Sequence, residues 1–186
     1  MRRDRDKIYA MTKIALCASL LSVVSWFVLP VPMSPVVLSF QTVAVGITAL
    51  ILSPGQSAWA MVLYLTMGAI GLPVFSGGTA GIGKLLGPTG GFYFGFLLSA
   101  IVVSFLKGKE PSILRYTTVL TLLGIPLQHI CAIIVMCIHN GGDVKTAFLG
   151  VSMPFIFGDI IKAIMTAYLG FEINKRLKIQ GERNKK

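Results

Sequence analysis

Long apolar stretches, separated by short polar or proline- and glycine-rich segments, divide the 186-residue chain. Most of these stretches approach the roughly 20 residues that a helix needs to cross the hydrocarbon core of a bilayer. The pattern therefore predicts an all-α integral membrane protein with six transmembrane helices, in a single transmembrane domain that covers residues 1–186. The six predicted spans are 8–29, 36–52, 57–72, 92–106, 112–138 and 151–177.

The segments between these spans contain residues that end or prevent helices. PVPMSP (30–35) contains three prolines and predicts an extended loop, whereas SPGQ (53–56) predicts a tight turn. Pro126 lies inside the fifth span and predicts a kink there. The glycine-rich segment 74–91 carries little charge except Lys84, and such backbone at a membrane surface must be buried in protein or line a cavity.

Composition and charge support this assignment and orient the chain. Only 13% of the residues are charged and the mean hydropathy is +0.78, whereas soluble domains are about 25% charged. The formal net charge is +10, and most basic residues lie near the two chain ends or in the KGKE loop (107–110). The positive-inside rule then predicts that both termini are cytoplasmic. These basic ends lie next to anionic lipid, so they do not indicate nucleic-acid binding.

PFIFGDIIK (154–162) places Asp159 and Lys162 inside the sixth span, on one helix face. Each charge costs about 2.5–3.5 kcal/mol at membrane depth. Two interpretations are open: a structural ion pair between helices, or a polar floor for a small ligand in the outer half of the membrane. A proton relay is disfavoured because the next titratable group along the helix, Glu172, lies about ten residues further on.

Several other polar and aromatic residues are predicted at the same depth. Gln41 and Gln128 face either the cavity or a neighbouring helix, and His129 is expected to form a hydrogen bond between helices. Tyr93 lies within reach of the cavity and can stack on a ring. Thr89 is expected to cap the fourth span, with Gly90 and Gly91 in its first turn, where the exposed N–H groups can donate to an anion or a carbonyl.

Enzymatic and nucleotide-binding motifs do not fit. Gly78, Gly83 and Lys84 nearly match a phosphate-binding loop, but Leu85 stands where that motif needs Ser or Thr, and no soluble strand precedes it. The sequence has no HExxH, no GxSG with a paired histidine and no pair of aspartates at membrane depth, so it does not predict an intramembrane protease. The cysteines lack metal-ligand spacing, and neither a metal nor a cofactor is predicted.

Small residues recur on the first span, in two strips four residues apart. Ala15 and Ser19 form one strip, and Ala18 and Ser22 form the other. Such spacing lets another helix approach closely, either a helix of a partner protein or one of this chain.

Three segments together resemble one family, the biotin-specific substrate-binding (S) components of energy-coupling factor (ECF) transporters, the BioY family. These segments are VPMSPVVLSFQT, YLTMGAIGLPVFSGGTAGIGKLLGPTGGFYFGF and PFIFGDIIKA. The resemblance implies the six-helix S-component fold in the cell membrane of a prokaryote. It also implies that the chain binds biotin from outside and works with a transmembrane coupling protein and two cytoplasmic ATPase subunits.

The resemblance also implies roles for individual residues. Phe75 and the glycine-rich loop with Gly78 and Thr79 are expected to enclose the ligand ring. The full set of expected substrate-binding residues is Asp159, Lys162, Tyr93, Thr89, Gly90, Gly91, Phe75, Gly78, Thr79, Gln41 and Gln128. The expected interface with the coupling protein is Ala15, Ala18, Ser19 and Ser22.

Two departures and several alternatives remain. Phe92 stands where many relatives have Tyr, and SPVVLSFQT differs from the usual segment, which leaves the role of Gln41 less certain. The chain could instead be an S component for another vitamin, or an ion-coupled secondary transporter that works alone. The orientation of biotin and the lid, either PVPMSP or 74–84, stay open.

Overall fold

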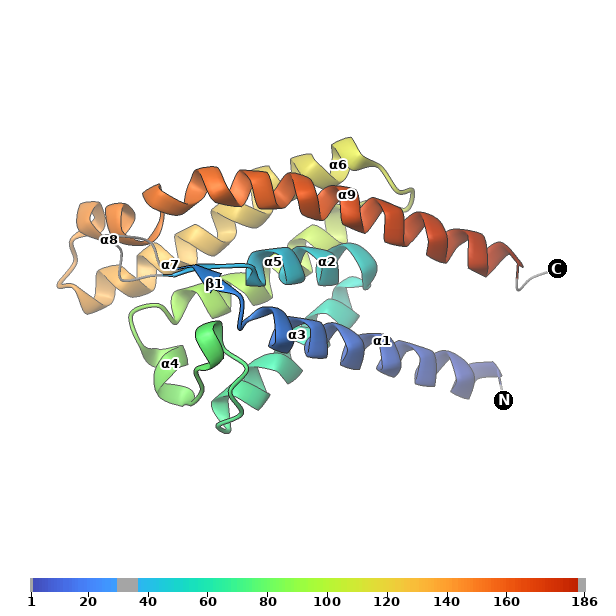
Figure 1. Cartoon of the computed structure of the whole chain (residues 1–186), viewed down its shortest axis with the longest axis horizontal. Coiled ribbons are helices and arrows are strands. Elements are labelled where there is room, and N and C mark those ends of the chain that lie inside the picture. Colours follow the sequence, from blue (N-terminus) through green and yellow to red (C-terminus); the bar gives the residue numbers. More distant parts are fainter. Residues whose placement is uncertain (1, 30–36, 184–186) are drawn as a thin grey trace.

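The computed structural model of the chain describes residues 2–29 and 37–183, most of them helical. The start of α1 and the end of α9 lie at the same end of the molecule, and α4 and α8 lie toward the opposite end (Figure 1). In chain order, the elements are α1 (Arg2–Val24), β1 (Val28–Leu29), β2 (Leu38–Ser39), α2 (Gln41–Ile51), α3 (Pro54–Ala69), the 3₁₀ turn η1 (Ser76–Gly78), α4 (Ile82–Leu86), α5 (Gly91–Leu106), α6 (Ile113–Val119), the π-helical segment η2 (Leu120–Gly124), α7 (Ile125–His139), α8 (Val144–Val151) and α9 (Met153–Arg183).

The all-α membrane fold predicted from the sequence is confirmed. Within the part of the chain that the structure describes, three helices are long and apolar enough to cross a membrane: Asp4–Val24, Ile113–His139 and Met153–Lys178. Gln41–Ile51 and Gly91–Leu106 are shorter apolar helices. The six predicted spans correspond to α1, α2, α3, α5, the continuous run α6–η2–α7, and α9.

The first helix ends earlier, and the second begins later, than the predicted spans because a small hairpin separates them. Val28 pairs with Ser39 and Leu29 with Leu38 in an antiparallel arrangement. Backbone groups at this depth need partners within the protein, and the hairpin supplies them where the helices have ended. The predicted PVPMSP loop lies outside the described residues.

The irregularity predicted in the fifth span is present as a π-helical segment. The segment Leu120–Gly124 lies immediately before Ile125 and Pro126. Proline cannot donate a backbone hydrogen bond and its ring crowds the preceding turn, so one widened turn accommodates it without ending the helix.

Two short helices, α4 in the glycine-rich segment and α8, lie between the predicted spans and were not predicted. The Asp143 side chain accepts hydrogen bonds from the backbone N–H groups of Lys145 and Thr146 and thereby begins α8. The hydrogen bond from the Thr146 hydroxyl is the main reason why the pKa of Asp143 is held below its usual value. Carboxylates at a helix N-terminus complement its unpaired N–H groups.

The end of α2 is capped by a lysine from the KGKE loop. Lys107 Nζ donates to the carbonyls of Ala49 (3.0 Å), Leu50 (2.8 Å) and Leu52. The last carbonyls of a helix have no intrahelical partner and carry partial negative charge. Lys107 therefore joins α2 to the end of α5, in addition to any effect of its charge on topology.

Glycines bring α5 and α7 close together beside the cavity described below. A Cβ atom added at Gly91 would lie 2.3 Å from the Cys131 carbonyl oxygen, and one at Gly95 would lie 2.7 Å from Gln128 Cα. Both neighbours are backbone atoms that cannot rotate away. Gly91, predicted to bind the ligand, thus serves the contact between helices.

We predict that Gly91→Ala lowers the stability of the protein by about 1–3 kcal/mol, because overpacking forces the helices apart. Thermal unfolding of the purified protein in detergent measures this. Gly55→Ala, where an added Cβ meets nothing within 4 Å, is the matched control and should not destabilise. Equal melting temperatures for the Gly91 variant and the unmodified protein would contradict the account.

Candidate ligand-binding site

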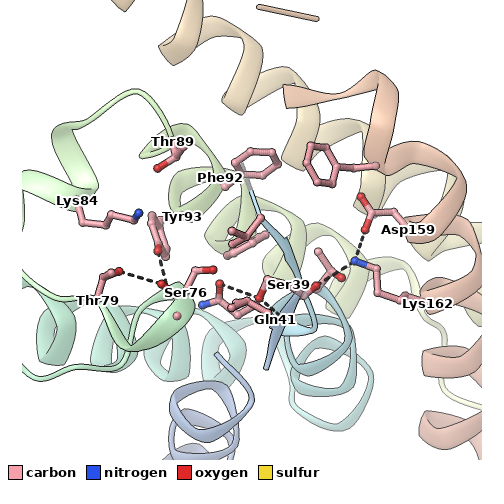
Figure 2. A pocket seen from close by; sticks show the side chains of 16 residues that line it. Ser39, Gln41, Ser76, Thr79, Lys84, Thr89, Phe92, Tyr93, Asp159 and Lys162 are labelled. Atoms are coloured by element: carbon pink, nitrogen blue, oxygen red, sulfur yellow. Dashed lines mark hydrogen bonds and ion pairs between the residues drawn. The ribbon is translucent and has the colours of Figure 1, made fainter. Parts of the chain in front are cut away.

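A cavity of about 310 Å³ lies between the β1–β2 hairpin, the start of α2, the glycine-rich segment, the start of α5 and the first half of α9 (Figure 2). Of the residues predicted to bind a ligand, six line it: Gln41, Thr79, Thr89, Tyr93, Asp159 and Lys162. Ten further described residues line it without having been predicted: Val28, Val37, Ser39, Thr42, Ser76, Gly77, Lys84, Phe92, Phe96 and Phe155.

Asp159 and Lys162 form a buried ion pair at one side of this cavity. Lys162 Nζ lies 2.5 Å from Asp159 Oδ1, and the two side chains are only 8% and 7% exposed. Lys162 also donates to the backbone carbonyl of Ser39 at 3.0 Å. The hairpin strand β2 therefore helps to hold the ammonium group, a contact that the sequence pattern did not reveal.

His129 of α7 completes the surroundings of the carboxylate. Its Nε2 lies 3.0 Å from Asp159 Oδ2, and its Nδ1 lies 3.0 Å from the Ser152 hydroxyl. The prediction that His129 forms a hydrogen bond between helices is confirmed. Its partner was missed, because no spacing along the chain indicates which residue of α9 faces α7. Both oxygens of Asp159 thus have a fixed partner, so the carboxylate has one orientation.

Two hydroxyl groups on the cavity wall have no hydrogen-bond partner among the described residues. These are Thr42 Oγ1 and Ser76 Oγ, and both atoms are buried. Buried hydroxyls ordinarily find a partner, so these two are exceptions. No sequence pattern marked them, because short hydroxyl side chains are common in membrane helices and loops.

Aromatic rings form much of the remaining wall. Phe92, Tyr93 and Phe96 come from α5 and Phe155 from α9. Phe75 does not line the cavity. It is fully buried behind Tyr93, with 4.6 Å between the two ring centroids. The Tyr93 hydroxyl accepts a hydrogen bond from the backbone N–H of Ser76 at 3.3 Å, which ties α5 to η1.

Four other predicted residues also lie off the cavity wall. Gly78 has a φ of +72°, and a Cβ there would meet the Trp26 ring at 2.9 Å. A Cβ at Gly90 would lie 1.8 Å from the Leu85 carbonyl oxygen, so Gly90, like Gly91, is needed for packing. Gln128 donates to the Ser99 hydroxyl at 3.0 Å and lines a separate void of about 20 Å³ behind the ion pair.

The predicted cap of α5 is wrong. The residue at the cap position is Gly90, and no side chain makes a capping hydrogen bond there. Thr89 contributes its backbone carbonyl, which accepts from the Phe92 N–H at 3.2 Å, while its side chain lies at the cavity. The cap position of α5 is therefore Gly90, one residue later than the sequence predicts.

The two small-residue strips of α1 differ in exposure. Ala15 and Ser19 are exposed, whereas Ala18 is buried and Ser22 is half-buried. The strip with Ala18 packs within the chain, whereas Ala15 and Ser19 lie on the outer face of α1.

Comparison with known proteins agrees with these features. A model of the BioY family matches residues 1–179. The chain is 35% identical over 178 residues to biotin transporter BioY2 of Lactococcus lactis subsp. cremoris (strain MG1363), which covers 94% of each protein. It is 29% identical over 165 residues to biotin transporter BioY of Thermotoga maritima, which covers 89% of this chain and 95% of the relative.

A solved structure has the same fold. The crystal structure of the S-component for biotin from an ECF-type ABC transporter matches with a TM-score of 0.83. The match covers 92% of this chain and 93% of that one, at 23% sequence identity.

We predict that His129→Ala destabilises the protein by about 1–3 kcal/mol, because it removes a hydrogen bond to a buried carboxylate. His139→Ala is the matched control on the same helix, since His139 is exposed and contacts only the Val135 carbonyl. Thermal unfolding in detergent compares the two. If both variants melt at the temperature of the unmodified protein, His129 does not hold Asp159 as described.

Proposed function

Because the chain belongs to the BioY family, we propose that it is the biotin-binding S component of an ECF-type importer. It binds biotin in the cavity between the hairpin, α5 and α9, and passes the vitamin on through other subunits. The named relatives are biotin transporters, and the fold is that of a biotin S component. The observation that carries the site assignment is a buried Asp159–Lys162 pair opening onto an aromatic-walled cavity.

The chemistry of biotin matches this cavity. Its ureido group has two N–H donors and one carbonyl acceptor, its thiophane ring is apolar, and its valerate chain ends in a carboxylate. Asp159 accepts N–H bonds, Lys162 donates, and Phe92, Tyr93, Phe96 and Phe155 enclose the ring.

The orientation in the membrane follows from charge and from the arrangement of the helices. The start of α1 and the end of α9 lie at one end of the molecule, and both segments are rich in Lys and Arg (Figure 1). The positive-inside rule assigns this end to the cytoplasm. The cavity lies toward the other end, so it takes up biotin from outside.

The energy for import comes from other subunits. The glycine-rich segment is not a nucleotide site, because Lys84 lies on the cavity wall and Leu85 replaces the hydroxyl residue that binds magnesium. A transmembrane coupling protein and two cytoplasmic ATPases supply the energy for import instead. The chain itself is neither an enzyme nor dependent on a cofactor. The exposed strip of Ala15 and Ser19 is the contact for the coupling protein.

We predict that Asp159→Asn and Lys162→Met each weaken biotin binding at least about tenfold, or roughly 1.4 kcal/mol. Each change removes one charge of the pair and leaves the other unpaired beside the ligand. Isothermal titration of the purified protein with biotin measures the affinity. The control is Glu110→Gln, which breaks the exposed Lys178–Glu110 pair outside the cavity and should leave affinity unchanged. Unaltered affinity in both Asp159 and Lys162 variants would remove the pair from the site.

We predict that Ala15→Trp retains biotin binding but fails to assemble with the coupling protein, because the indole separates the two helices. Co-purification with an affinity-tagged coupling protein, together with biotin titration, measures both properties. Ile134→Trp is the matched control, since Ile134 is 54% exposed on α7, away from this strip. Normal recovery of the complex with Ala15→Trp would contradict an interface on α1.

A further inference from the structure

The cavity carries an unbalanced positive charge. Three of the described lining residues are charged: Lys84, Asp159 and Lys162. Asp159 and Lys162 neutralise each other across 2.5 Å, whereas the side-chain ammonium of Lys84 makes no hydrogen bond or ion pair with any described residue. The cavity therefore matches a ligand with one negative charge, and the place of that charge depends on which lysine is available.

The end of the cavity at Lys162 is poorly suited to a carboxylate. Lys162 already uses two of its three N–H donors, on Asp159 and on the Ser39 carbonyl. A ligand carboxylate on the remaining donor would lie beside the Asp159 carboxylate in a buried setting, where like charges repel strongly. A neutral group with N–H donors for Asp159 and a carbonyl for Lys162 fits without that repulsion.

The end at Lys84 has the opposite character. Lys84 is a half-buried residue of α4, and Figure 2 shows its amino group directed toward Tyr93, across the pocket from Asp159 and Lys162. No described carboxylate lines this side of the cavity. Ser76 of the neighbouring η1 turn also lines the cavity.

We propose that Lys84 binds the carboxylate of biotin and thereby fixes the ligand with its ureido ring at Asp159 and Lys162. The proposal rests on the function proposed above, and it adds a residue that selects the free acid over its amides. Lys84 acts as a charged donor at the end of the valerate chain, and the aromatic side chains between the two ends enclose the apolar part of the molecule.

The test compares biotin with biotinamide, its neutral amide, on five purified proteins: unmodified, Lys84→Gln, Lys84→Arg, Lys162→Met and Lys145→Gln. We expect the unmodified protein to prefer biotin at least about tenfold, as for a hydrogen bond to a charged group. Lys84→Gln should lose most of this preference, because its affinity for biotin falls while its affinity for biotinamide changes less than about twofold. Lys84→Arg should retain the preference. Lys145 is exposed on α8, so Lys145→Gln controls for general charge and should leave the preference intact.

Other outcomes separate the two proposals. If the unmodified protein binds biotin and Lys84→Gln keeps the same preference for biotin over biotinamide, the role of Lys84 is overturned and the proposed function stands. If Lys162→Met instead removes the preference selectively, the ligand lies in the reverse orientation. If the unmodified protein does not bind biotin at all, the proposed function itself fails.

Discussion

The burial of Asp159 and Lys162 within the membrane is the constraint on which the rest of the site depends. Two charges at this depth are tolerated only when they are paired and their remaining hydrogen-bonding capacity is met. Here His129 forms a hydrogen bond with the second oxygen of the Asp159 carboxylate, and the Ser39 carbonyl accepts a hydrogen bond from the Lys162 ammonium. The pair thus draws α7 and the β1–β2 hairpin toward α9, and the cavity forms where these elements meet.

The same requirement for satisfied backbone explains the irregular elements around the cavity. The β1–β2 pairing follows the end of α1 and precedes α2, and it satisfies backbone N–H and carbonyl groups beside the cavity. Gly90, Gly91 and Gly95 let the glycine-rich segment and α7 approach α5 without side chains between them. The cavity wall is therefore made of aromatic rings and short hydroxyl residues, supported from behind by close backbone packing.

The features that could be predicted from the sequence are those whose signal lies within one segment of the chain. Apolar length and charge placement are local, and they identified the membrane fold and the six segments. The spacing of Asp159 and Lys162 on one helix face is also local, and it indicated the pair. The partner of His129, the β2 contact to Lys162 and the role of Lys84 depend on which helices become neighbours, and no periodicity encodes that. Phe75 and Gly78 were assigned through the family resemblance, and Gly90 and Gly91 through their place at the start of the fourth span. Both kinds of signal mark residues that shape the cavity as well as residues that line it.

The central claim is that the paired, hydrogen-bonded Asp159 and Lys162 form the polar floor on which biotin binds. A structure of the protein in complex with biotin, at a resolution that distinguishes the ureido ring from the valerate chain, tests it most directly. The account predicts a ureido N–H within hydrogen-bond distance of an Asp159 oxygen, with the Asp159–Lys162 pair intact. Biotin bound outside this cavity, or bound within it with no contact to either side chain, would contradict the account.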